Sequence, residues 1–237
     1  MNVSDLRFYA QPFSDAESSW PDDVRRVMRR RSKRVVRRRL GLLRMVPFAF
    51  RYMRARRRTR QIDLAPFRQR GLNNQLFIDT QLNFLAFFIA LQEMLGTDEA
   101  VDLCREVMEE AAYEPMLLCL PKQDNVRAVG QPFEVMSEFL RAFPEASARG
   151  GSHLMHIVED SDEAFQFDVS WCVWLELARA AGVPEACMAN CHADDLVFPD
   201  YFNDLGIRYR RTQTLACGGT CCDFRFERMS HTAGDNG

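Results

Sequence analysis

Ile207–Leu215 (IRYRRTQTL) and Cys222–Glu227 (CDFRFE) flank the glycine pair Gly218-Gly219 near the end of the chain. Both stretches alternate with the period of two that is typical of half-buried strands, and the glycine pair predicts a hairpin turn between them. Residues 154–159 and 164–170 alternate in a similar way. The sequence therefore predicts a small sheet in the C-terminal part, antiparallel or mixed because two of its strands are joined by a hairpin.

The chain before residue 150 has the pattern of helices. Apolar residues recur at helical spacing through 73–95, 98–120 and 132–143, and the first of these helices is expected to stop at Gly96. A further helix is expected over 172–181, within the strand region. The fold class is therefore α+β: an N-terminal helical half followed by a small antiparallel or mixed sheet with an inserted helix.

Positive charge is concentrated near the N-terminus. Residues 24–70 hold 18 arginines and one lysine against a single acid, Asp63, which is a net charge of +18 and leaves −20 for the rest of the chain. The same region has a helical pattern that Gly41 and Pro47 interrupt. We therefore divide the chain into a basic, arginine-rich helical extension (1–70), an α+β domain (71–229) and a disordered tail (230–237).

The basic extension has several interpretations. Charge runs are usually solvated faces, so the simplest is a solvated helical segment, or one that docks on the acidic remainder of the same chain. The alternatives are an anionic partner for residues 24–70, either a membrane surface or a nucleic-acid backbone. No motif that reads RNA or DNA accompanies the run.

The composition predicts a cytoplasmic protein. The N-terminus lacks the pattern of a signal peptide, and the most apolar stretch, 82–95, is too short and too polar to span a bilayer, which needs roughly 20 apolar residues. The eight cysteines are then expected to be reduced thiols. They lack the paired Cys-x-x-Cys knuckles of structural zinc sites, so no cofactor is expected, and a metal ion stays an open alternative. The oligomeric state is not predicted.

Three thiols and an acid are the candidates for catalysis. Cys191 and Asp194 share one face if their segment is helical, and they could act as nucleophile and base or as two metal ligands. Cys172 lies where a strand meets a helix, and helix N-termini lower thiol pKa values. Cys222 lies on the strand face of two phenylalanines, so it either packs in the core or lines a pocket cut into it. A small buried core thiol is the simple alternative for each cysteine.

Three polar residues are the candidates for binding a substrate. Arg211 is a cation on a largely apolar strand face, and it needs a partner, either an acid of the protein or a carboxylate ligand. Asp223 points away from the face of Cys222, and Thr214 is a weaker candidate. His192, His153 and His156 are given little weight as catalytic or metal-binding groups.

The C-terminal motifs resemble a known family. Arg211-x-x-Thr214-Leu-Ala-x-Gly218 followed by Cys222-Asp-Phe-Arg-Phe, with Cys191-x-x-Asp194 and Cys172 upstream, is similar to the signature of L-2-amino-thiazoline-4-carboxylic acid hydrolases. The layout fits over residues 70–228, and the motifs lie within 165–228. A more remote similarity is to ligand-binding domains related to 4-vinyl reductase.

The resemblance implies hydrolytic opening of a cyclic isothiourea, 2-aminothiazoline-4-carboxylate, toward a carbamoyl-cysteine. The substrate would be a small carboxylate held by Arg211, Asp223 and Thr214, with Cys191, Asp194, Cys222 and Cys172 as the catalytic group. Two other functions stay open: a non-catalytic small-molecule sensor or accessory domain that uses the same pocket, and an adaptor that acts through the basic segment.

Overall fold

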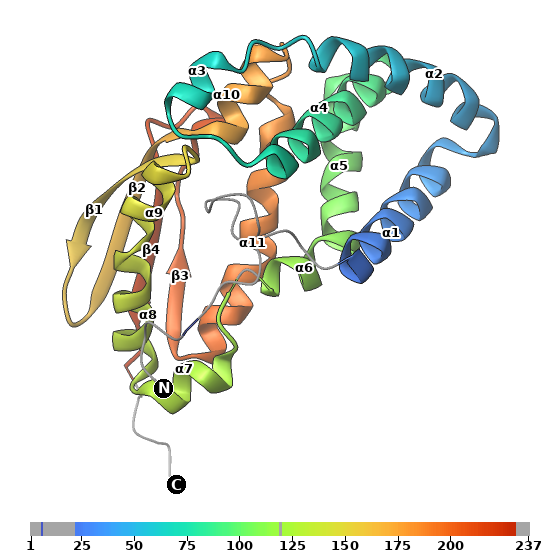
Figure 1. Cartoon of the computed structure of the whole chain (residues 1–237). Helices are drawn as coiled ribbons and strands as arrows, with labels where there is room; N and C mark the ends of the chain where they lie inside the picture. Colours follow the sequence, from blue (N-terminus) through green and yellow to red (C-terminus); the bar gives the residue numbers. More distant parts are fainter. Residues whose placement is uncertain (1–5, 7–21, 119, 231–237) are drawn as a thin grey trace, which may run out of the picture.

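The computed structural model describes residue 6, residues 22–118 and residues 120–230 (Figure 1). Helices form the N-terminal half and a four-stranded sheet follows, so the expected α+β class is confirmed. The expected disordered tail lies almost wholly outside the described residues. The helices of this half are α1 (Asp22–Leu40), α2 (Leu42–Thr59), α3 (Ala65–Gln69), α4 (Gln75–Leu95), α5 (Thr97–Ala111), α6 (Tyr113–Leu117), α7 (Gln123–Val129), α8 (Pro132–Arg141) and α9 (Phe143–Arg149).

The second predicted helix is interrupted. The sequence predicted one helix to residue 120, but α5 ends at Ala111 and the short α6 follows. Pro115 explains the break, because its ring would clash with the carbonyl of Ala111 in a continuous helix. The helix before it behaves as predicted: Asn74 accepts a hydrogen bond from the backbone N–H of Phe77 at its start, and Gly96 ends it with a φ of 90°.

The sheet is antiparallel throughout, in the order β1-β2-β4-β3. Two helices rather than one are inserted between its second and third strands. The strands and these helices are β1 (His153–Asp160), β2 (Ala164–Cys172), α10 (Val173–Ala180), α11 (Ala186–Asp204), β3 (Ile207–Arg210) and β4 (Cys222–Arg228).

The third strand is shorter than predicted. It ends at Arg210 instead of Leu215, because the backbone N–H groups of Thr212 and Gln213 leave the ladder and donate to the carboxylate of Asp223 (2.9 and 2.8 Å). A single 3-10 turn over Leu215–Cys217 then leads to Gly218, whose φ of 86° is readily adopted by glycine.

Two apolar clusters form the core, and α11 belongs to both. One lies among α1, α2, α4, α5 and α10, and includes Cys187 in the first half of α11. The other lies between the sheet, α8 and the second half of α11, where Phe165, Phe167 and Val169 of β2 are buried as their alternation predicted. Cys172 and Leu215 pack against both clusters. The end of β2 is therefore the place where the helical half meets the sheet.

Part of the basic extension docks on the chain's own acids. Arg38 pairs with Glu106 and Glu110 of α5, Arg31 pairs with Glu114, and Arg54 pairs with Glu93 of α4 (2.7 Å). Self-docking was one of the interpretations of the sequence, and these contacts place α1 against α5 and α2 against α4. In the described ranges, no helix combines the length and the apolar character that crossing a bilayer requires.

Candidate functional site

His153 is the first residue of β1 and Cys172 is the last residue of β2, and the two lie side by side. They are register partners in the antiparallel pair. Cys172 is also the N-cap residue of α10, so its thiol lies at the N-terminus of that helix. The imidazole of His153 stacks on Trp174 with ring centroids 4.8 Å apart. The strand-to-helix junction predicted for Cys172 is confirmed, and the pairing adds a histidine to it.

Helix α11 brings two further thiols to Cys172. Cys187 and Cys191 are one turn apart, and the Cys187 thiol interacts with the sulfurs of both Cys172 and Cys191. The Cys187 hydrogen bond holds the pKa of the Cys172 thiol well below its usual value against the opposing effect of burial, and His153 and the Leu175 N–H act in the same direction. The pKa of Cys187 is raised by the same contacts and by burial. Of the two coupled thiols, Cys172 is therefore the one whose pKa is shifted in the direction that favours the thiolate.

Arg211 and two acids form the other half of the site. The guanidinium is only 3% exposed, and it pairs with Asp194 (2.9 Å) and Asp195 (2.7 Å) and donates to the carbonyl of Cys191 (2.7 Å). The sequence allowed either an acid of the protein or a carboxylate ligand as the partner of Arg211. In the structure, acids of the protein pair with it. Burial raises the pKa of Asp194 to about 6, with Arg211 lowering it and the charge of Asp195 raising it.

Cys191 and Asp194 both lie on α11, so the helix on which their predicted shared face depended is present. Cys222 is buried on β4, where its sulfur accepts the backbone N–H of Leu215 (3.2 Å). Burial raises the pKa of this thiol to about 12, and the charges of Cys191 and Cys172 add to the rise. A pKa this high favours the neutral thiol at Cys222.

Asp223 and Thr214 hold the loop that carries Arg211. The carboxylate of Asp223 accepts two backbone N–H groups and the Thr212 hydroxyl, and these bonds lower its pKa although burial acts in the opposite direction. The Thr214 hydroxyl accepts the N–H of Cys217 (3.2 Å). Both side chains are thus engaged within the loop that follows β3.

Three residues of the site were not among the candidates that the sequence favoured. Cys187 carried a usable signal, because it lies four residues before Cys191 and so shares its helix face. His153 carried none, since only the strand register brings it to Cys172. Tyr209 on β3 has a buried hydroxyl without a hydrogen-bond partner in the described structure, next to Arg211 and Phe224.

Other polar groups lie elsewhere or form no metal site. The imidazole of His192 faces Glu109 of α5 (3.0 Å), on the surface of the helical half. Within residues 22–118 and 120–230, no three His, Cys, Asp or Glu side chains are arranged to hold a metal ion. The candidate site is therefore a thiol, imidazole and carboxylate cluster.

A model of a known protein family matches most of this chain. The family model for L-2-amino-thiazoline-4-carboxylic acid hydrolase matches residues 78–226, which include the whole sheet up to Phe226, both inserted helices and every side chain of the cluster. No curated protein and no solved structure matches the chain. Because the matched region spans more than half of the sequence, the chain belongs to the L-2-amino-thiazoline-4-carboxylic acid hydrolase family.

Proposed function

We propose that Cys172 is the nucleophile in a two-step hydrolysis of L-2-amino-thiazoline-4-carboxylate. Membership of the family implies hydrolysis of this substrate. The observation that supports Cys172 for the attack is its position: a thiol that precedes a helix, opposite His153 in the strand register and beside the Cys187 thiol. A thiolate stabilised in this way is the reactive form of cysteine.

In the first step, the Cys172 sulfur bonds to C2 of the ring, the amidine-like carbon. The bond between C2 and the ring sulfur then breaks, and the departing sulfur takes a proton from His153, which has received the Cys172 proton. In the second step, His153 removes a proton from water, the oxygen bonds to the same carbon, and Cys172 leaves as a thiolate. The product is a carbamoyl-cysteine with a free thiol, and the overall change is the addition of one water molecule.

Asp194 is the proposed partner of the ring's amidine group. The Asp194 side chain is 24% exposed, and Arg211 holds it through an ion pair. Asp194 also interacts electrostatically with His153. The unpartnered hydroxyl of Tyr209 is a further donor at the same place. Asp223 and Thr214 contribute by holding the Arg211 loop, and Cys222 acts as a neutral wall of the site.

The proposed reaction uses side chains of this chain and no cofactor or metal. We also propose a cytoplasmic location, since a reducing compartment keeps thiols of this kind free.

The direct test is to incubate the purified protein with the thiazoline and to measure free thiol and product mass, with and without a chelator. We expect a stoichiometric rise in thiol that the chelator does not change. Ring opening without a free thiol would show that the C–N bond breaks instead, and loss of turnover with the chelator would disprove the metal-free mechanism. Binding without turnover would favour the sensor function.

We expect the activity to depend on the ionisation of Asp194. The pKa of this acid is about 6, so kcat/KM should rise as the pH increases through 6 and should fall about tenfold per unit below it, where the carboxylate is protonated. Asp194→Asn should remove this limb from the pH profile and lower the activity at neutral pH.

Asp195→Asn is the matched control, because Asp195 pairs with the same arginine and is more exposed. Its charge raises the pKa of Asp194, so its removal should keep the limb and move it to lower pH. If the rise of kcat/KM near pH 6 stays unchanged in Asp194→Asn, a group other than Asp194 must cause it.

A further inference from the structure

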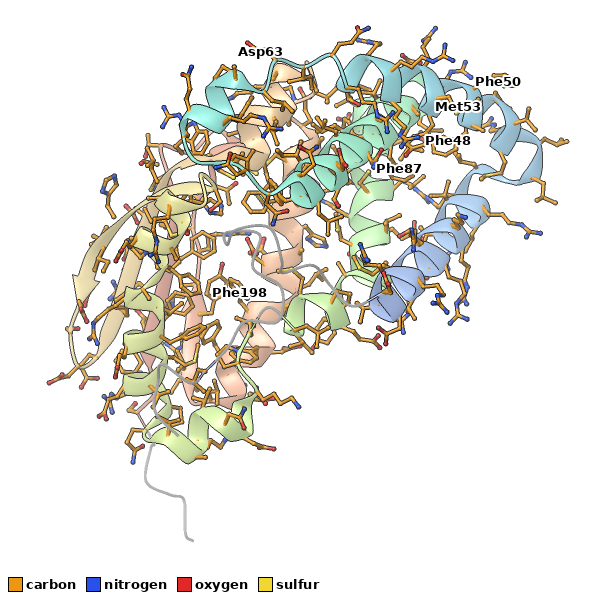
Figure 2. All side chains as sticks on the ribbon, in the orientation of Figure 1. Phe48, Phe50, Met53, Asp63, Phe87 and Phe198 are labelled. Carbon is orange, nitrogen blue, oxygen red and sulfur yellow. The ribbon has the colours of Figure 1, made fainter. Side chains whose placement is uncertain are left out.

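The outer face of α2 is an exposed apolar stripe. Its members recur at helical spacing, their side chains are between 52% and 93% exposed, and they comprise Leu42, Leu43, Val46, Phe50 and Met53. The opposite face is the one that packs: Phe48 lies toward Phe87 of α4, with ring centroids 5.7 Å apart, whereas Phe50 and Met53 point outward (Figure 2). An apolar stripe of this kind on a folded helix indicates a binding surface.

The neighbouring helix carries positive charge that the protein does not neutralise. Six cations of α1 are exposed, and no acid among the described residues pairs with them: Arg26, Arg29, Arg30, Lys33, Arg34 and Arg37. Arg44 and Arg57 of α2 are likewise without an ion pair there. These cations differ from Arg31, Arg38 and Arg54, which dock the helices on the protein's own acids. The two helices therefore carry uncompensated positive charge as well as the apolar stripe.

The turn between the helices places apolar side chains at its tip. Gly41, with a φ of 72°, separates α1 from α2, and Leu42 and Leu43 follow immediately. In Figure 1 this turn lies at the edge of the molecule away from the sheet. The hairpin also precedes residues 78–226, so it is an addition to the part of the chain that the family model describes.

We propose that the α1–α2 hairpin docks the protein on an anionic lipid bilayer. The apolar stripe would enter the boundary between headgroups and acyl chains, and the free arginines would bind lipid phosphates. A nucleic acid would use the arginines alone and would leave five exposed apolar side chains without a role. The hairpin lies on the membrane instead of crossing it, in agreement with the polar character of both helices.

Sedimentation of the full-length protein with lipid vesicles tests this proposal. We expect binding to vesicles made of one part phosphatidylglycerol and two parts phosphatidylcholine, weaker binding at high salt, and little binding to phosphatidylcholine alone. Arg30→Ala/Arg34→Ala/Arg37→Ala should weaken the binding roughly 100-fold, because each cation near an anionic surface contributes a several-fold factor. Leu43→Glu/Phe50→Glu should weaken it by about tenfold or more.

The chain offers matched controls for both variants. Val158→Glu changes a 58% exposed apolar residue of β1, and Arg149→Ala/Arg179→Ala removes exposed cations outside the hairpin; neither should change the binding. All variants should keep the thermal unfolding midpoint of the parent protein, since the changed side chains are exposed. Absence of vesicle binding, equal binding to neutral vesicles, binding of an RNA duplex in its place, or a dimer that Phe50→Glu dissociates would each overturn the proposal.

Discussion

Cys172→Ala should lower kcat for thiazoline hydrolysis by at least about 10³-fold, because it removes the proposed nucleophile and leaves only binding and charge stabilisation. The substitution removes one sulfur atom from a half-buried position, so the fold should persist and the substrate should still bind. Thiol release measures the rate, and binding of the thiazoline by calorimetry measures the remaining affinity. A fall in kcat without a comparable loss of affinity is the expected signature of a missing nucleophile.

Cys104→Ala is the control for this experiment. Cys104 is a fully buried thiol of α5, away from the candidate site, and burial raises its pKa to about 12, opposite to the direction of the shift at Cys172. Its loss should leave the rate unchanged. Alkylation gives an independent reading: iodoacetamide near neutral pH should label Cys172 before Cys222, whose pKa is also about 12. Full activity in Cys172→Ala would assign the attack to Cys191 or to water.

The sheet could be predicted from sequence because its pattern is local. The faces of β2 and β4 were correct, with Phe165 and Phe167 buried and Cys222 opposite in direction to Asp223. The end of β3 could not be predicted, since it depends on Asp223 capturing two backbone N–H groups about ten residues earlier in the chain. A side chain that competes for the backbone N–H groups of a strand does not change the alternation of apolar and polar residues in the sequence.

The site was predictable to the extent that it follows from single elements. Two features each depend on a single segment. Cys172 lies at a strand-to-helix junction, and Cys191 and Asp194 lie one turn apart on one helix. The pairing of Cys172 with His153 needs the register of two strands, and the choice of partner for Arg211 needs the position of α11 against β3. Most residues of the candidate site could therefore be identified from the sequence, but their arrangement in space could not.

Arg211→Met should destabilise the fold by about 2–3 kcal/mol, the second large effect that the structure predicts. The guanidinium is buried, and its removal leaves Asp194 and the carbonyl of Cys191 without their donor. The estimate lies below the usual cost of breaking a fully buried pair because Asp195 is half-exposed. The activity should fall as well, since Asp194 loses the contact that positions it, and the pH limb near 6 should move upward as the favourable charge disappears.

Arg225→Met is the matched control, because Arg225 also pairs with two acids, Glu159 and Glu227, but on the outer face of β4, where its side chain is 32% exposed. Surface pairs of this kind contribute about 1 kcal/mol or less. Urea unfolding of the two variants should therefore differ clearly. Arg211→Met/Asp194→Asn should recover part of the stability without the activity, since it removes the unpaired charge and the catalytic carboxylate together. Equal stability losses in Arg211→Met and Arg225→Met would mean that Arg211 is not the organising contact between α11 and the loop after β3.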